Sequence, residues 1–129
     1  MMDKDRPYIR VENLKKYFST KRGMLHAVDD VSFDIQKGET LGLVGESGCG
    51  KSTLGRCLIR LLDSTAGKVL LRDEAGGGYT DVTKVNASTM KELRRRVQIV
   101  FQDPYSCLNP RLSVWELIAE PLIVNSVYR

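Results

Sequence analysis

The sequence is poor in the residues that bind metals or form disulfides, with three cysteines and one histidine among 129 residues. Cys49, Cys57 and Cys107 are odd in number and widely spaced. They therefore indicate neither a zinc site nor a disulfide framework, and free thiols fit a reducing compartment.

Long apolar runs are also missing. No stretch approaches the roughly 18 apolar residues that suggest a membrane-spanning helix, and the N-terminus has no apolar core of the kind found in secretory signals. We therefore expect neither secretion nor a membrane span. With 42% apolar and 28% charged residues, the composition fits about one small globular domain.

Aromatic residues are scarce, and this bears on how the net charge of +4 is interpreted. Part of the charge lies in the run Lys91–Arg96. Such a run is able to contact nucleic acid or anionic lipid, but no aromatic stacking residues interleave it. A solvated helix face is the favoured interpretation, so no nucleic-acid partner is expected.

A phosphate-binding pattern, G-x-x-x-x-G-K-S/T, is the most informative motif present. Its glycines let the backbone N–H groups point inward at phosphates, while the lysine reaches the β and γ oxygens and the serine hydroxyl contacts Mg²⁺. The pattern predicts a nucleoside triphosphate site made by Gly45, Glu46, Ser47, Gly48, Cys49, Gly50, Lys51, Ser52 and Thr53.

The flanks of this loop support the prediction. The uncharged run Thr40–Val44 predicts a buried parallel strand before the loop. After the loop, apolar residues recur at helical spacing and predict an amphipathic helix whose N-terminal dipole favours the anion. These residues are Leu54, Cys57, Leu58, Leu61 and Leu62.

Other segments have simpler patterns. Alternating apolar residues in Tyr8–Leu14 and residues 31–36 predict half-buried antiparallel strands, and Lys68–Arg72 predicts another strand before a loop over Asp73–Gly78. Val97–Phe101 predicts a second buried strand.

Two capping boxes predict helix starts. One lies at Thr89 and the other at Ser113, each with glutamate three residues later. In the second helix, Pro121 is predicted to end or kink the helix near Glu120.

The run of residues 98–111, Gln-Ile-Val-Phe-Gln-Asp-Pro-Tyr-Ser-Cys-Leu-Asn-Pro-Arg, resembles the Q-loop region of ABC transporter ATPases. More narrowly, it is similar to ATP-binding subunits of oligopeptide and dipeptide importers, with Cys107 where serine is usual. Residues 45–53 resemble the family's Walker A motif, and Val11–Tyr17 resembles the stretch that places an aromatic residue under adenine. The resemblance spans Tyr8–Val124.

The resemblance implies roles for single residues. Tyr17 would stack on adenine, although a half-buried tyrosine at a strand end is the alternative. Gln102 would contact Mg²⁺ or the attacking water. Gln102 and Lys51 would be the catalytic residues, and Gln102 and Ser52 would be the residues that contact the metal. ATP and Mg²⁺ are the implied cofactors.

The implied fold class is α/β, a P-loop NTPase of the ABC ATPase type. It would be incomplete, with an antiparallel β-subdomain, the first part of the parallel core and the start of the helical subdomain. The implied partners are transmembrane permease subunits and a second ATP-binding subunit, at the cytoplasmic face of the membrane. The loop Gln102–Arg111 is predicted to be exposed and to contact the permease.

Several family motifs do not occur before Arg129: a Walker B strand, the leucine-serine-glycine-glycine-glutamine signature and a switch histidine. His26 precedes the P-loop and does not match that switch. We therefore expect residues 1–129 to be the N-terminal part of a nucleotide-binding domain that does not hydrolyse ATP alone.

Three alternatives to a peptide importer follow from the same P-loop. A GTPase would need an asparagine-lysine-x-aspartate motif, which is lacking. A soluble ABC ATPase of repair or translation, or an inactive truncated fragment, remains as an alternative, and the run Asp103–Arg111 favours the importer.

Overall fold

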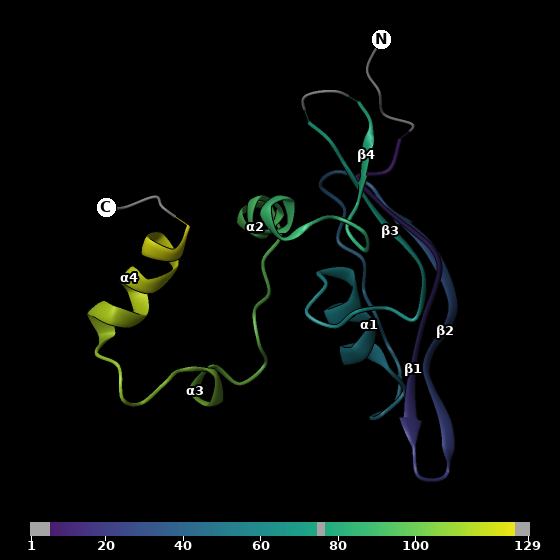
Figure 1. Ribbon diagram of the computed structural model, residues 1–129, viewed down its shortest axis with the longest axis horizontal. Coiled ribbons are helices and arrows are strands. Elements are labelled where there is room, and N and C mark those ends of the chain that lie inside the picture. The colour runs from purple at the N-terminus through teal and green to yellow at the C-terminus, as the bar shows by residue number, and fades with distance from the viewer. Residues whose placement is uncertain (1–5, 75–76, 126–129) are drawn as a thin grey trace. The chain divides into compact units, whose positions relative to one another are not determined.

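The structure is a computed structural model that describes residues 6–74 and 77–125 (Figure 1). The chain divides into two compact units, residues 1–86 and 87–129. The first unit holds the sheet and the P-loop, and the described residues of the second unit form three helices.

The first unit contains a four-stranded antiparallel sheet in the order β2-β1-β3-β4. Its strands are β1 (Ile9–Thr20), β2 (Gly23–Ile35), β3 (Ala66–Arg72) and β4 (Tyr79–Asp81). The predicted antiparallel strands are thus confirmed, and β1 and β2 are longer than predicted. β4 was not predicted because three residues are too few to show an alternating pattern.

The core of this unit lies between the sheet and α1 (Lys51–Leu58), which contacts β1 and β2 (Figure 1). Val11 and Val69 are paired across β1 and β3, and both are 2% exposed. Burying such apolar side chains is the main stabilising contribution to a small domain. The other buried apolar residues here are Leu14, Val28, Leu54, Cys57, Leu71 and Val82.

Helix α1 ends at Leu58, four residues before the end of the predicted apolar face. Arg60 has a left-handed φ of 50°, and its guanidinium donates to the carbonyls of Val82 at 3.3 Å and Val85 at 2.6 Å. These bonds stabilise a turn in place of another helical turn. Leu61 is consequently 50% exposed, and the prediction that it belongs to the buried face is wrong.

The two predicted buried strands are also wrong. Thr40–Val44 and Val97–Phe101 are irregular, and Val44 and Val100 are 94% and 95% exposed. A strand is stable only when its backbone groups pair with a neighbour, and no strand in the described part of the chain pairs with either segment. An apolar sequence alone does not supply that partner.

The second unit contains α2 (Ala87–Arg96), α3 (Pro104–Cys107) and α4 (Val114–Val124). Helix α2 begins two residues before the capping box predicted at Thr89. Met90 and Leu93 are its buried residues, whereas the basic side chains of Lys91–Arg96 are exposed, as predicted for a solvated face. Among the described residues, no helix has the length and apolar character needed to cross a bilayer.

Helix α4 begins at the predicted capping box. The Ser113 hydroxyl accepts from the Glu116 N–H at 3.3 Å, and the Ser113 N–H donates to the Glu116 carboxylate at 2.7 Å. Pro121 was predicted to end or kink the helix near Glu120, and it does not end it, because α4 continues to Val124. Proline lacks the N–H of one helical bond, but the N–H of Asn125 still bonds to the Pro121 carbonyl at 3.2 Å.

Candidate functional site

The P-loop leads directly into the N-terminus of α1. Gly50 caps this helix with a φ of 94°, and no side chain caps the first N–H groups. Exposed N–H groups and the helix dipole both favour an anion at this position. The local geometry therefore suits the phosphate-binding prediction made for residues 45–53.

The ammonium of Lys51 folds back over the loop that precedes it. Its Nζ donates to the carbonyls of Gly45 at 2.6 Å and Glu46 at 2.5 Å, and it lies 3.4 Å from the Cys49 sulfur. Phosphate oxygens are charged and accept stronger hydrogen bonds than these neutral carbonyls do. A bound triphosphate would therefore compete well for this ammonium.

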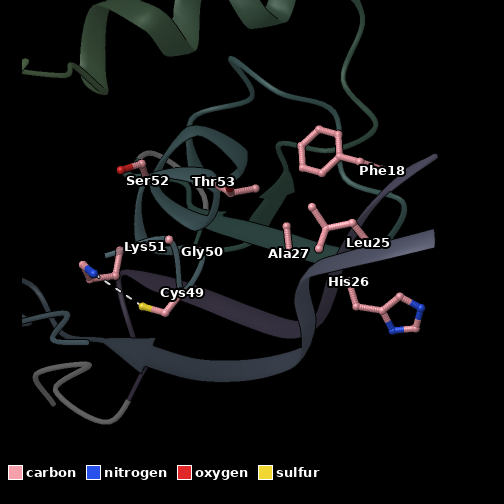
Figure 2. A pocket seen from close by; sticks show the side chains of 10 residues that line it. Phe18, Leu25, His26, Ala27, Cys49, Gly50, Lys51, Ser52 and Thr53 are labelled. Atoms are coloured by element: carbon pink, nitrogen blue, oxygen red, sulfur yellow. Dashed lines mark hydrogen bonds between the residues drawn. The ribbon is translucent and has the colours of Figure 1, made fainter. Parts of the chain in front are cut away.

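A cavity of about 320 Å³ opens beside the loop (Figure 2). One wall is polar and comes from the P-loop and α1, and the other comes from the β1–β2 hairpin. Such a cleft offers charge complementarity for phosphates and an apolar surface for a base. The lining residues are Phe18, Leu25, His26, Ala27, Gly48, Cys49, Gly50, Lys51, Ser52 and Thr53.

The structure does not bring Tyr17 to this cavity. Its ring stacks on His26, with centroids 3.9 Å apart and planes at 16°, and its hydroxyl donates to the Asp29 carboxylate. That hydrogen bond raises the pKa of Tyr17 and lowers the pKa of Asp29. The side chain expected to stack on adenine is therefore engaged elsewhere.

Phe18 lines the cavity instead, and the sequence reasoning missed it. Successive side chains of a strand point to opposite faces, so Tyr17 and Phe18 diverge. Figure 2 shows the rings of Phe18 and His26 pointing in different directions, with the His26 ring turned away from Lys51. The adjacent aromatic residues Tyr17 and Phe18 indicated that one of them lies near the P-loop, but the sequence alone did not show which one.

Gln102 lies in the second unit, in an exposed irregular segment before α3. It is not among the residues that line the cavity of the first unit. Its contact with Mg²⁺ or the attacking water stays a prediction.

The segment predicted to meet a partner is exposed. Tyr105 is 87% exposed and Leu108 is 50% exposed. Asp103 precedes Pro104 and has an extended backbone, as residues before proline usually do, and its carboxylate accepts from the Tyr105 N–H at 3.0 Å. A short helix, α3, replaces part of the predicted loop.

Cys57 is buried in the core, as expected, and burial raises the pKa of its thiol. A thiol held in its neutral form is a poor nucleophile. The buried position therefore agrees with a packing role.

Comparison with known sequences gives one family over most of the chain. The profile of the ABC transporter family matches residues 28–126. The oligopeptide transport ATP-binding protein OppF of Bacillus subtilis (strain 168) is 50% identical over 119 residues, which are 92% of this chain and 37% of that protein. A probable peptide ABC transporter ATP-binding protein, y4tS of Sinorhizobium fredii, is 47% identical over 121 residues, 88% of this chain and 33% of that protein. The chain thus spans about a third of the length of these relatives.

Solved structures give the same fold. The bacterial ABC transporter cassette MJ0796, solved as a dimer, is similar with a TM-score of 0.72 and 26% identity, over 94% of this chain and 48% of that one. The same cassette has been solved with ADP and phosphate, with a TM-score of 0.71. The cbiO1 protein of Clostridium perfringens has a TM-score of 0.59 at 24% identity, over 92% of this chain and 50% of that one, which shows likeness of fold alone.

Proposed function

Because this chain belongs to the ABC transporter family and has the fold of its ATP-binding cassette, we propose that the cavity beside the P-loop is its ATP site. The observation that carries the proposal is the position of Lys51. Its ammonium lies over the loop, beside the uncapped N-terminus of α1 and at the wall of a cavity of about 320 Å³. Positive charge and free N–H groups converge there on a space that a nucleotide fits.

Residues 45–53 would bind the phosphates through their backbone, and Lys51 would contact the β and γ oxygens. The Ser52 hydroxyl lies in the first turn of α1, lines the cavity and is exposed, so it fits a ligand of Mg²⁺. A bound Mg²⁺ would supply charge neutralisation at the phosphates. Gln102 is proposed as a second contact to the metal or to the attacking water in the complete protein.

Phe18 is proposed as the residue that contacts the base, in place of Tyr17. Its ring lines the cavity, whereas Tyr17 is stacked on His26. The Lys16 ammonium lies 5.0 Å from the centre of the Phe18 ring, so one face of the ring is already in contact with a cation. The opposite face would remain for adenine, and stacking of this kind gives only modest base selectivity.

In the complete protein, we propose that ATP binding and hydrolysis power peptide import. The relatives named above are described as oligopeptide and peptide transport proteins, and the MJ0796 cassette is dimeric. Membrane permease subunits and a second ATP-binding subunit are the proposed partners, and the cytoplasmic face of the membrane is the proposed location.

Substitution of Lys51 tests the site. Lys51→Ala should weaken binding of a fluorescent ATP analogue about ten- to a hundredfold, because charge-assisted hydrogen bonds to the phosphates are lost. Lys84→Ala, which removes an exposed lysine of the same unit that does not line the cavity, is the matched control and should bind normally. Equal affinities of wild type and Lys51→Ala would refute the assignment.

A further inference from the structure

Three side chains of the β1–β2 hairpin form a connected cluster beside the cavity. Tyr17 stacks on His26, the residue directly opposite it in the strand pair. Asp29 joins both, because it accepts from the Tyr17 hydroxyl through one carboxylate oxygen and lies 3.4 Å from His26 Nδ1 through the other. None of these three side chains belongs to the phosphate-binding loop, so the cluster has a role other than binding phosphate.

The strand register is irregular just before this cluster. The pairing of β1 with β2 shifts between Val11 and Leu14, between Leu14 and Lys16, and between Lys16 and Tyr17. Regular pairing resumes only from Tyr17 to Thr20, which face His26 to Gly23. Bulges of this kind change the direction in which the following side chains point.

Burial does not fix the register of this final stretch. Met24 and Leu25 are 57% and 56% exposed, although they are adjacent and point to opposite faces. Where neither face is buried, register is weakly specified. A slip of one residue would turn Phe18 away from the cavity and bring a neighbouring side chain in its place.

The cluster of Tyr17, His26 and Asp29 specifies the strand register that burial leaves open. A stacked pair of rings forms only when Tyr17 lies directly opposite His26, and the two bonds to Asp29 add a third point of attachment. Lys15 and Asp30 form an ion pair at 3.7 Å. Asp30 interacts electrostatically with Tyr17, and Lys15 with Asp29, so this pair adds to the polar interactions of the cluster. Cross-strand aromatic pairs stabilise the register in which they meet.

We propose that Tyr17, His26 and Asp29 form a register clamp that holds the Phe18 ring toward the nucleotide base. This proposal rests on the ATP site proposed above. Tyr17 is then a positioning residue that acts on ATP affinity through Phe18, without touching the nucleotide.

The test compares a ligand that has a base with one that lacks it. ATP and inorganic tripolyphosphate each compete with a fluorescent ATP analogue for the protein. Tyr17→Leu should weaken ATP about three- to tenfold and leave tripolyphosphate within about twofold, since the aromatic contact is lost and the phosphate loop is intact. Tyr17→Phe keeps the stack and should lose less. Trp115→Leu, which removes an exposed ring from the second unit, should change neither affinity.

A double variant separates positioning from direct contact. Phe18→Leu alone should weaken ATP selectively, and adding Tyr17→Leu to it should cause no further loss, because Tyr17 acts only through that ring. If the loss of ATP affinity in the double variant equals the product of the losses in the two single variants, Tyr17 itself touches the base and the proposal is overturned. No loss in Tyr17→Leu, or an equal loss for tripolyphosphate, would overturn it as well.

Two controls keep these outcomes clear. Circular dichroism establishes whether each variant is folded. If Tyr17→Leu is not folded, Asp29→Ala replaces it, because this variant removes the shared acceptor and keeps both rings. Asp29→Ala should also weaken ATP and leave tripolyphosphate unchanged. Lys51→Ala in the same assay should weaken both ligands. If it weakens neither, the proposed ATP site fails independently of the clamp.

Discussion

Gly50 lies so close to Ala27 that no side chain fits between them: a Cβ added to Gly50 would be 2.1 Å from the Ala27 carbonyl oxygen. Gly50 also has a φ of 94°, a conformation that residues with a Cβ rarely adopt. The contact joins the end of the P-loop to β2 at Ala27, which itself lines the other wall of the cavity. The two walls of the site therefore touch where the backbone of Gly50 meets the Ala27 carbonyl, and only glycine allows this close approach.

Gly50→Ala should consequently disrupt the loop. The clash and the unfavourable φ together are expected to cost about 1–3 kcal/mol or more, seen as a lower midpoint of thermal unfolding, with loss of ATP binding. Gly55→Ala is the control, because Gly55 lies in α1 with no atom within 4 Å of an added Cβ. That variant should gain about 0.5–1 kcal/mol of stability from helix propensity. Normal binding by Gly50→Ala would show that the loop rearranges freely.

Helix α4 should weaken in acid through its capping box. The backbone N–H and then the hydroxyl of Ser113 hold the pKa of Glu116 below its ordinary value of 4.5. Because the pKa of Glu116 is lowered, its hydrogen bonds with Ser113 stabilise the folded state fully above pH 4.5. This stabilisation is lost as the pH falls through the lowered pKa of Glu116. Helix content measured by circular dichroism should fall in that window.

Glu116→Gln should flatten this part of the acid profile, because the titrating group is gone. Glu120→Gln, on the same helix but outside the box, should leave the profile as in wild type. An identical acid dependence in Glu116→Gln and wild type would contradict the assignment to the cap.

The exposed apolar segments should make this chain self-associate. Val44 and Val100, at 94% and 95% exposure, lie in segments whose backbone has no strand partner among the described residues. Unpaired apolar segments are sites for edge pairing between molecules. Light scattering should rise with concentration and should fall in Val100→Lys.

Gln98→Lys adds the same charge two residues away at an exposed polar position and serves as the control. It should reduce scattering less than Val100→Lys does. A monomer at all concentrations, with a cooperative transition at high temperature, would refute the expectation.

ATP hydrolysis by these 129 residues alone is expected to stay at the background rate. Phosphoryl transfer depends on positioning and charge stabilisation, and the Walker B, signature and switch-histidine motifs are absent from this sequence. Phosphate release at saturating ATP and Mg²⁺ is the measurement. Turnover that Lys51→Ala abolishes would show that other groups replace those motifs.

The exposed segment around α3 is predicted to contact the permease in the complete transporter. Substituting both Tyr105 and Leu108 by serine removes two exposed apolar side chains and should leave ATP binding unchanged. Peptide transport should be lost, or the permease should no longer copurify. If the double variant assembles and transports normally, the permease contact lies elsewhere.

Features that depend only on neighbouring residues could be predicted from the amino-acid sequence. The P-loop is a contiguous pattern, the box at Ser113 needs only its own helical turn, and the alternation in Tyr8–Leu14 was enough to place a strand. The exposure of Tyr105 also followed from a short, proline-broken segment. Local geometry governs each of these, so local sequence predicts them.

Features that depend on partners far away in the chain became visible only in the folded structure. Thr40–Val44 has the composition of a buried strand, yet it is irregular because it has no partner among the described strands. Helix α1 ends early because Arg60 finds carbonyl acceptors more than twenty residues away. Phe18, and not Tyr17, lines the cavity, and it does so in the stretch of β1 that follows three register shifts. Alternation along a strand gives two faces, but only pairing with β2 determines which of them meets the P-loop.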